Sequence, residues 1–236
     1  MQVTQLVILA GGKGTRLLKE TEILPKPLVA LFDKKAMLDI LLDRFIGTFD
    51  NILILAGYKG ELIQDHISDN YGDVYSNIKV VMEDDLAGTG GALLVNREFL
   101  NDYFMLINGD TWFDTDLQGQ SFIYPESCAQ LLLTNSLDSS RYGAVEIDMG
   151  GRIVSFIEKT RIKDQEEGLI NTGCYLVSKT ILGYIKTLPC SLEQDIFPLL
   201  SELGLIEGRV ENGAFLDIGI PSALEFARQH KEFFTP

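Results

Sequence analysis

The sequence predicts an α/β protein in which a mostly parallel sheet carries helices on both faces. In the first half of the chain, short apolar runs alternate with stretches of helical periodicity. Strands that alternate with helices favour parallel pairing, because each crossover leaves room for a helix. Apolar residues make up 46% and charged residues 23% of the 236 residues, which is typical of a globular protein.

The elements of the first half follow in a regular order. Strands are predicted for four apolar runs, at residues 6–10, 52–56, 78–82 and 103–108. Helices are predicted where apolar residues recur every three or four positions, at residues 36–46, 61–67 and 91–100. Ligands of open α/β sheets bind beyond the carboxyl ends of the strands. We therefore expect the chemistry in the loops after Ala10, Met82 and Asn108.

The second half contains more strands and fewer helices. Strands are predicted at residues 129–134, 144–148, 152–157 and 169–177. Short helices are predicted at residues 192–200 and 223–231. These strands are expected to extend or cap the sheet in mixed directions. No repeat, low-complexity tract or linker divides the chain, so we expect one domain over residues 1–236.

The charge balance excludes several classes of partner. The chain has 20 basic and 34 acidic residues, a net charge of -14, which is the wrong sign for gripping a nucleic acid. An anionic substrate must then be held by a few local cations and backbone amides.

No apolar run approaches the roughly 18 residues of a membrane span, so no membrane partner is expected. The N-terminus lacks a signal-peptide pattern, which favours a cytoplasmic location.

The cysteines predict neither a metal site nor a disulfide framework. Cys128, Cys174 and Cys190 are an odd number and show no CxxC spacing. Reduced, buried thiols are the expected state.

A glycine-rich segment follows the first predicted strand. This glycine loop, residues 11–17, reads GGKGTRL. Its glycines let the backbone turn tightly and direct several N–H groups at one anion. It is not the dinucleotide-binding fingerprint, because Leu17 stands where a third glycine is required, and no Walker A pattern can be drawn. With Lys13 and Arg16 inside it, the glycine loop predicts a phosphate site rather than a plain turn.

Two further cationic and acidic features fit the same chemistry. Lys26 lies between Pro25 and Pro27, which stiffen the backbone that presents it. Arg16 can act as a bidentate fork and Lys26 as a point charge toward a triphosphate. Asp110 and Asp217, the carboxylate pair, each end an apolar run, and two carboxylates with phosphate oxygens commonly hold Mg²⁺. The alternative is that each aspartate is a turn or cap residue.

Seven motifs, in this order, resemble those of the sugar-1-phosphate nucleotidyltransferases. They are LAGGKGTRL (9–17), LPKP (24–27), GTGGA (88–92), NGD (108–110), EK (158–159), NTG (171–173) and FLDIGIP (215–221). The resemblance covers nearly the whole chain. It implies a Rossmann-like three-layer sandwich with a mixed, mostly parallel central sheet. It also implies a nucleoside triphosphate and a sugar 1-phosphate as substrates and Mg²⁺ as cofactor, and it leaves a homo-oligomer open.

The resemblance also implies roles for individual residues. Arg16 and Lys26 would be catalytic, and Asp110 and Asp217 would bind the metal. The nucleotide would be bound by Leu9, Gly11, Gly12, Gly14, Thr15, Arg16, Glu83, Gly88, Thr89 and Asp110. The sugar phosphate would be bound by Lys26, Gly143, Glu158, Lys159 and Asn171.

The reaction expected from these residues needs no general base. A phosphate oxygen of the sugar 1-phosphate attacks the α-phosphorus of the triphosphate and expels pyrophosphate. The attacking phosphate is already ionised, because the second pKa of a phosphate monoester is about 6. The two histidines, His66 and His230, lie in stretches of helical periodicity and are expected to pack or face solvent. Positioning and charge neutralisation then carry the catalysis.

Glu83 favours guanine as the base. An ionised carboxylate only accepts hydrogen bonds, and guanine offers two neighbouring donors where uracil and thymine offer one. The alternative is a solvated charge beside Asp84 and Asp85. Overall, the chain looks most like the D-glycero-D-manno-heptose-1-phosphate guanylyltransferases, which serve bacterial surface polysaccharides. Mannose-1-phosphate guanylyltransferases and N-acetylmuramate-1-phosphate uridylyltransferases are the rivals. A non-catalytic nucleotide-sugar sensor and a nicotinamide dehydrogenase are the alternatives of other classes.

Overall fold

The structure is a computed structural model that describes residues 3–17, 21–72, 76–83, 87–136, 142–157 and 167–234. The chain packs as two compact units, each built from separate stretches of sequence. Unit 1 comprises Met1–Val3, Ala87–Leu106 and Thr115–Gly213, and unit 2 comprises Thr4–Leu86, Ile107–Asp114 and Ala214–Pro236. The division into two units does not test whether the chain is one domain, so the single domain over residues 1–236 stays a prediction.

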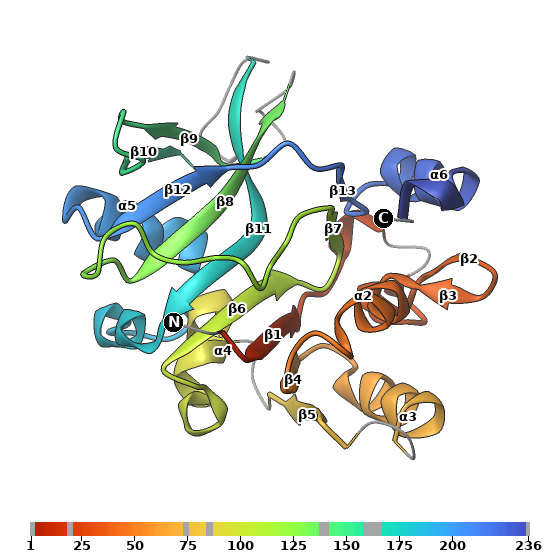
Figure 1. The fold of residues 1–236 in the computed structure, drawn as a ribbon. Helices are drawn as coiled ribbons and strands as arrows, with labels where there is room; N and C mark the ends of the chain where they lie inside the picture. The colour runs from red at the N-terminus through yellow and green to blue at the C-terminus, as the bar shows by residue number, and fades with distance from the viewer. Residues whose placement is uncertain are drawn as a thin grey trace. The chain divides into compact units, whose positions relative to one another are not determined.

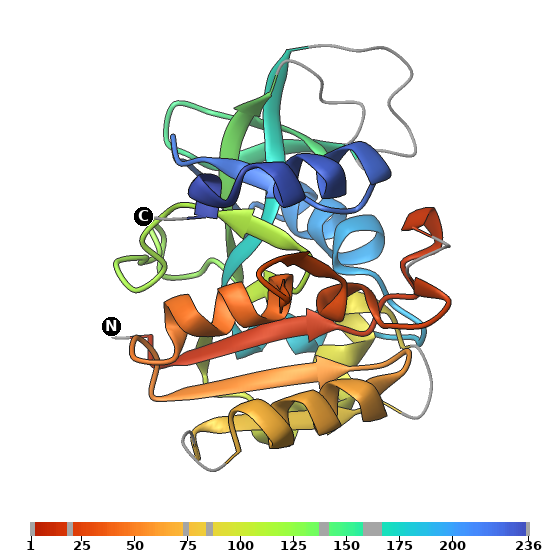
Figure 2. The same ribbon diagram turned by 90° about the vertical axis from the view of Figure 1, so that its right-hand side faces the viewer.

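Unit 2 contains a parallel sheet of three strands. They are β1 (Gln5–Ala10), β4 (Asn51–Ala56) and β5 (Ile78–Met82), with Leu6 opposite Ile52 and Ile52 opposite Ile78. The crossovers carry α2 (Met37–Phe45) and α3 (Gly60–Asn70), which lie side by side over one face of these strands (Figures 1 and 2). The nearly all-apolar strands β1 and β4 are almost completely buried, as is usual for parallel strands.

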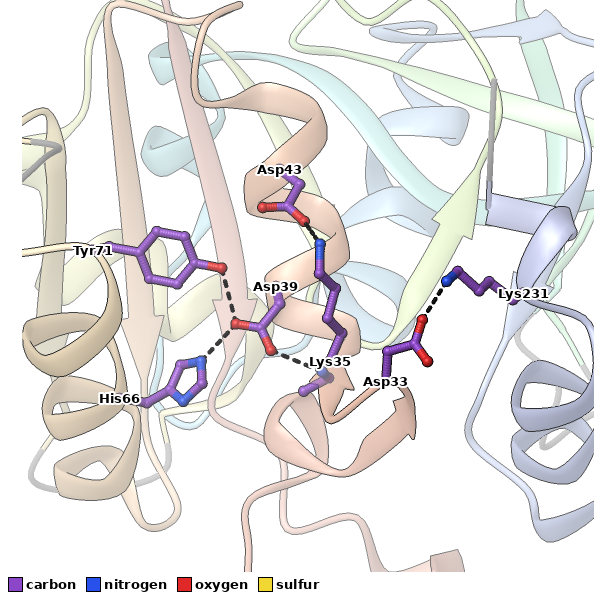
Figure 3. Close-up of polar contacts among 8 residues, drawn as sticks. Asp33, Lys35, Asp39, Asp43, His66, Tyr71 and Lys231 are labelled. Atoms are coloured by element: carbon purple, nitrogen blue, oxygen red, sulfur yellow. Dashed lines mark hydrogen bonds and ion pairs between the residues drawn. The ribbon is translucent and has the colours of Figure 1, made fainter.

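A hydrogen-bonded cluster joins α2 to α3 (Figure 3). The buried Asp39 carboxylate accepts from His66 Nε2 at 2.6 Å, the Tyr71 hydroxyl at 2.9 Å and the Ala36 N–H at 2.8 Å. Burial would raise the pKa of Asp39, but these donors outweigh it and leave the pKa below its ordinary value. Since a carboxylate only accepts, His66 Nε2 carries the hydrogen in this contact.

Short elements complete unit 2. The hairpin of β2 (Ala30–Phe32) and β3 (Lys35–Ala36) turns through Asp33 and Lys34, which both have positive φ. β7 (Thr111–Phe113) pairs antiparallel with β13 (Phe215–Asp217). The remaining helices are η1 (Thr15–Leu17), η2 (Lys26–Leu28), α6 (Pro221–Gln229) and η8 (Lys231–Phe234).

Unit 1 is built on a mainly antiparallel sheet. β11 (Gly168–Ser178) pairs antiparallel with β8 (Ala129–Ser136) and β9 (Ala144–Ile147), and β9 pairs antiparallel with β10 (Ile153–Ile157). β12 (Ile206–Val210) adds a parallel partner to β8. β6 (Tyr103–Asn108) begins in this unit, and its last two residues belong to unit 2. The helices are α4 (Gly88–Val95), η3 (Arg97–Phe99), η6 (Lys179–Tyr184), the π-helical turn η7 (Leu192–Ile196) and α5 (Phe197–Glu202).

The predicted fold class is confirmed, with local corrections. Strands and helices form an α/β fold with a mixed sheet, parallel in unit 2 and mainly antiparallel in unit 1. The helix predicted at residues 91–100 is wrong in its bounds. It begins at Gly88 and ends at Val95, because the Asn96 side chain donates to the Ala92 carbonyl at 2.9 Å and a separate turn follows. The helix predicted at residues 223–231 ends at Gln229, so His230 lies just beyond it.

Two other expectations concern the whole chain. The three cysteines are buried, as predicted. Of the helices that the structure describes, none has both the length and the apolar character needed to cross a membrane.

Candidate functional site

The glycine loop leaves β1 with its backbone open at one position. A side chain placed on Gly12 would meet no atom of the described residues within 4 Å, whereas one on Gly14 would lie 2.7 Å from Thr21 Cγ2. Gly14 also has φ +62°, a left-handed conformation that glycine adopts without strain. The side chains of Lys13 and Arg16 are exposed. The loop therefore presents bare backbone at Gly12 beside two cations, as a phosphate site requires.

Thr21 holds the glycine loop from its buried side. Its hydroxyl lies 3.1 Å from the Gly14 carbonyl and 2.9 Å from the Leu17 carbonyl, so one hydrogen is shared between both acceptors. The Thr21 side chain is only 3% exposed. Thr21 was not among the residues predicted from the sequence, because a threonine at this spacing carries no pattern of its own.

Lys26 is a buried cation between two acidic groups. Lys26 is only 7% exposed to solvent. Its ammonium forms an ion pair with Asp110 Oδ2 and lies 3.6 Å from Asp217 Oδ1. Pro25 precedes it in extended conformation, and Pro27 follows within η2. The stiff segment predicted from the two prolines thus places Lys26 against the carboxylate pair.

Strand pairing brings the two members of the carboxylate pair together. Asp217 is opposite Thr111 in the β7–β13 ladder, and the Ile218 N–H donates to the Asp110 carbonyl at 3.1 Å. On the other side, the Gly109 N–H donates to the Leu9 carbonyl at 2.9 Å, which joins the ends of β1 and β6. A side chain on Gly109 would lie 2.9 Å from that same oxygen. The loops after Ala10 and Asn108 therefore meet, as expected.

The carboxylate pair fits Mg²⁺ by its donor set. Two carboxylates already converge on one cation, and Mg²⁺ is commonly held by one or two carboxylates together with substrate phosphates and water. Among the described residues there is no group of three or more acidic, histidine or cysteine side chains that could hold a metal alone. Any ion bound here would need phosphate or water oxygens to complete its shell.

Glu83 lies near the glycine loop in unit 2. It follows β5, its N–H donates to the Ala56 carbonyl at 2.8 Å, and its side chain is partly exposed. Its Oε1 would be 3.8 Å from a Cβ placed on Gly11. Asp84 and Asp85, which the alternative interpretation of Glu83 invokes, lie outside the described residues.

Gly88 and Thr89 belong to unit 1 and pack against the segment before η7. Gly88 has φ +80°, and a side chain there would come within 2.4 Å of the Cys190 carbonyl. That carbonyl accepts from the Gly90 and Gly91 N–H groups at 2.9 and 3.1 Å. The Thr89 hydroxyl donates to Glu193 Oε2 at 2.7 Å. The start of α4 is thus held by its own unit.

The described residues expected to bind the sugar phosphate in unit 1 are joined to Thr89. The Asn171 N–H donates to the Gly143 carbonyl at 2.9 Å. The Asn171 amide donates to the Tyr175 hydroxyl at 2.9 Å, which in turn donates to Glu193 Oε1 at 3.3 Å. Glu158 and Lys159 lie outside the described residues.

Neither Tyr175 nor Glu193 was among the residues predicted from the sequence. Tyr175 stands four residues after Asn171, a spacing that places two strand residues on the same face and could have indicated it. Glu193 carries no such signal, because Thr89 and Tyr175, which connect it to the predicted site residues, are 104 and 18 positions away.

A family comparison matches residues 5–232, almost the whole chain, to a model described as nucleotidyl transferase. This chain belongs to the nucleotidyl transferase family.

Individual relatives of this nucleotidyl transferase cover it to different extents. The D-glycero-alpha-D-manno-heptose 1-phosphate guanylyltransferase of Campylobacter jejuni is 31% identical over 92% of this chain and 95% of its own length. The bifunctional protein GlmU of Methanococcus aeolicus is also 31% identical, over 95% of this chain and 53% of its own length. The chain thus spans about half the length of that relative.

Among solved structures, HddC from Yersinia pseudotuberculosis is similar to this nucleotidyl transferase throughout. Its crystal structure superposes with a TM-score of 0.82 and 30% identity, covering 97% of this chain and all of that one. The structure of HddC complexed with GMP-PN gives a TM-score of 0.80 and 31% identity. These comparisons identify the family, and the roles of single residues stay predictions.

Proposed function

We propose that this chain joins a sugar 1-phosphate to a nucleoside triphosphate and releases pyrophosphate. The observation that carries the proposal is the buried Lys26 ammonium between Asp110 and Asp217, in the same unit as the open glycine loop with Arg16. This arrangement suits phosphoryl transfer, in which the protein positions anions and neutralises their charge. The family match and the transferase names of the relatives support it.

The mechanism follows from the groups present. A phosphate oxygen of the sugar 1-phosphate attacks the α-phosphorus in line, and the bond to the bridging oxygen of the leaving pyrophosphate breaks. The backbone at Gly12 and the Arg16 guanidinium hold the triphosphate, and Lys26 donates to a phosphate oxygen at the reacting end. Mg²⁺ held by Asp110 and Asp217 supplies charge neutralisation when bound. The attacking oxygen is ionised near pH 7, so no side chain needs to accept a proton.

We further propose that the two substrates are GTP and D-glycero-D-manno-heptose 1-phosphate. The Glu83 carboxylate lies beside the glycine loop and, as an acceptor, suits the two neighbouring donors of guanine. A relative named as a heptose 1-phosphate guanylyltransferase and the HddC complex with GMP-PN support this choice. Mannose-1-phosphate guanylyl transfer and N-acetylmuramate-1-phosphate uridylyl transfer are the alternatives.

The test is pyrophosphate release with Mg²⁺ across pairs of substrates. GTP, UTP, dTTP, CTP and ATP are each combined with heptose, mannose, glucose and N-acetylmuramate 1-phosphates. Release with GTP and heptose 1-phosphate alone would support the finer proposal, and a preference for UTP would overturn the guanine argument. If the protein bound nucleotide sugars but released pyrophosphate from no pair of substrates, the proposal of an enzyme would give way to that of a nucleotide-sugar sensor.

A pair of aspartate variants tests the metal role. We expect Asp110→Ala to lower pyrophosphate release by about 100-fold or more, because charge on the phosphates is no longer neutralised there. Asp114→Ala is the matched control, since Asp114 is a partly exposed carboxylate in the same unit that pairs with Arg44 at 3.0 Å. Normal Mg²⁺-dependent turnover in Asp110→Ala would contradict the assignment.

A further inference from the structure

We propose that Tyr175 and Glu193 are positioning residues that decide which hydrogen-bonding group Asn171 offers to the sugar 1-phosphate. Together, Asn171, Tyr175, Glu193 and Thr89 form a chain of hydrogen bonds within unit 1, here called the relay. The inference rests on the proposed function, because it takes the sugar 1-phosphate as the ligand of Asn171.

The direction of the relay is set by the carboxylate. Glu193 can only accept, so the Tyr175 hydroxyl must donate to its Oε1, which lies 3.3 Å away. The Tyr175 oxygen is then left as an acceptor for the amide nitrogen of Asn171, 2.9 Å away. Burial, and next the charge of Glu193, raise the pKa of Tyr175 well above its usual value. The phenol therefore keeps the proton that it donates.

A second contact fixes the same amide from the other side. The Gly173 N–H can only donate, and it donates to Asn171 Oδ1 at 3.0 Å. With Oδ1 engaged by Gly173 and one amide hydrogen engaged by Tyr175, a single N–H of Asn171 has no acceptor within the described part of the chain. The orientation of the Asn171 amide is thus fixed, with one N–H directed at an acceptor on the ligand, such as a hydroxyl or phosphate oxygen, and one lone pair of Oδ1 left beside it.

The relay also reaches the start of α4. Glu193 Oε2 accepts from the hydroxyls of Thr89 at 2.7 Å and Ser191 at 3.0 Å. The Thr89 oxygen in turn accepts from the Leu192 N–H at 2.8 Å. One carboxylate therefore orients both Asn171 and the Gly88–Thr89 turn. It is held in the π-helical turn η7, an irregularity that is common at functional sites.

Tyr175→Phe tests the relay because it removes only the hydroxyl. The ring is fully buried and packs against Phe197 with centroids 5.1 Å apart, so the packing is kept. We expect KM for the sugar 1-phosphate to rise about tenfold, while KM for the triphosphate and kcat change by less than about twofold. Tyr124→Phe is the matched control, because it removes a hydroxyl that donates to the Gly150 carbonyl at 3.0 Å in the same unit. Equal rises in both KM values would overturn the inference.

Glu193→Gln gives a second variant with a different expectation. The amide keeps one acceptor and adds a donor, so it can no longer accept from both Tyr175 and Thr89. We expect KM to rise about tenfold for the sugar 1-phosphate and also severalfold for the triphosphate, since the relay is broken toward both ends. Glu202→Gln, at an exposed position on α5, controls for the lost charge. A Glu193→Gln enzyme with unchanged KM values would overturn the inference.

A measurement without substrate separates this inference from the proposed function. In protein labelled with ¹⁵N-asparagine, the side-chain amide signal of Asn171 is assigned by its loss in Asn171→Asp. We expect this signal to shift in Tyr175→Phe and in Glu193→Gln and to stay in place in Tyr124→Phe. An unmoved signal in both relay variants would overturn the inference. Absence of pyrophosphate release by the unaltered protein would instead overturn the proposed function.

Discussion

At the scale of single residues, Thr21 holds two carbonyl groups of the glycine loop with one hydroxyl. Both acceptors, Gly14 and Leu17, belong to the segment expected to surround the triphosphate. Because Thr21 is buried, water cannot take over these contacts if the hydroxyl is removed. The shape of the glycine loop therefore depends on a side chain that need not touch the substrate.

We predict that Thr21→Val destabilises the protein by about 1–2 kcal/mol and raises KM for the triphosphate several times. Valine has nearly the same shape but removes the hydroxyl that donates to both carbonyls, and of the two only the Gly14 carbonyl keeps a second donor among the described residues, the Leu17 N–H at 2.9 Å. Thr48→Val is the control, since its hydroxyl donates at 3.3 Å to the Arg44 carbonyl within α2, away from the glycine loop. Urea unfolding and initial-rate kinetics measure the two effects. A variant with normal KM for the triphosphate would contradict the role of Thr21.

Some site residues could be predicted from the sequence, and others could not. Asp110 and Asp217 stand out because charged groups at the ends of apolar runs are expected to meet at the edge of a sheet, and Lys26 stands out because two prolines flank it. Thr21, Tyr175 and Glu193 are ordinary polar residues by composition. Only the folded backbone brings their partners within hydrogen-bond distance, whether these lie four residues away, as Leu17 and Asn171 do, or far along the chain, as Thr89 does.

At the scale of elements, the glycine loop contains two glycines with opposite requirements. Gly14 has positive φ and no space for a side chain, whereas the surroundings of Gly12 are open. A side chain at Gly14 would strain the backbone, whereas a side chain at Gly12 would fill the space offered to a ligand.

We predict that Gly12→Ala unfolds like the original protein but raises KM for the triphosphate about tenfold or more. Gly14→Ala is expected to lose about 1–3 kcal/mol of stability, through backbone strain and the clash with Thr21. Thermal unfolding and steady-state kinetics on the two variants separate structure from binding. A Gly12→Ala protein with unchanged KM would remove the open backbone from the proposed phosphate site.

The link between α2 and α3 depends on the charge of Asp39 (Figure 3). We predict that Asp39→Asn lowers stability at pH 7 by about 2 kcal/mol, because one of the three donors then faces an amide nitrogen. Asp43→Asn on the same helix should cost less than about 0.5 kcal/mol, since its pair with Lys35 is exposed on both sides.

The Asp39 effect should depend on pH in a definite direction. The pKa of Asp39 is lowered in the folded protein, so its stabilisation is complete above the unfolded value of about 3.9. It is lost as the pH falls through the lower folded value. The free energies of unfolding of the original protein and of Asp39→Asn, measured with urea, should therefore converge as the pH falls below about 4. A difference that persists undiminished at lower pH would contradict this explanation.

The elements that were predicted correctly are those with a clear period. β5 and β6 have the expected bounds, because their apolar runs end at turn-forming residues. β2, β3, β7 and β13 contain two or three residues each, too few to show alternation. β12 was missed because Glu207 and Gly208 interrupt its apolar pattern. Glu207 is fully buried there, where it accepts from Ser127 at 2.8 Å and Gln130 at 2.6 Å.

At the scale of the whole molecule, the net charge of -14 makes Lys26 important before any substrate binds. Its ammonium already neutralises part of the carboxylate pair, so a metal ion must compete with it. The phosphates of a bound triphosphate give Lys26 an alternative partner and add oxygen ligands for the metal. Metal and nucleotide should therefore bind together better than either binds alone.

We predict that millimolar Mg²⁺ alone shifts the thermal midpoint by less than about 1 °C. Mg²⁺ with the preferred triphosphate should raise it by about 5 °C at a nucleotide concentration about 100 times Kd. Chelation with EDTA should stop pyrophosphate release, and added Mg²⁺ should restore it. If Mg²⁺ alone stabilised the protein as much as the combination, Lys26 would not be its competitor.

The two units alternate along the chain, and this limits how the protein can be divided. Unit 2 comprises three segments, Thr4–Leu86, Ile107–Asp114 and Ala214–Pro236. The segments of unit 1 lie before and between them in the sequence. A cut at any single peptide bond between residues 87 and 213 therefore separates parts of one unit from each other. Neither unit can be produced intact as one continuous fragment. Joining two separately expressed halves would require the fragments to find each other and fold together, as in split-protein complementation.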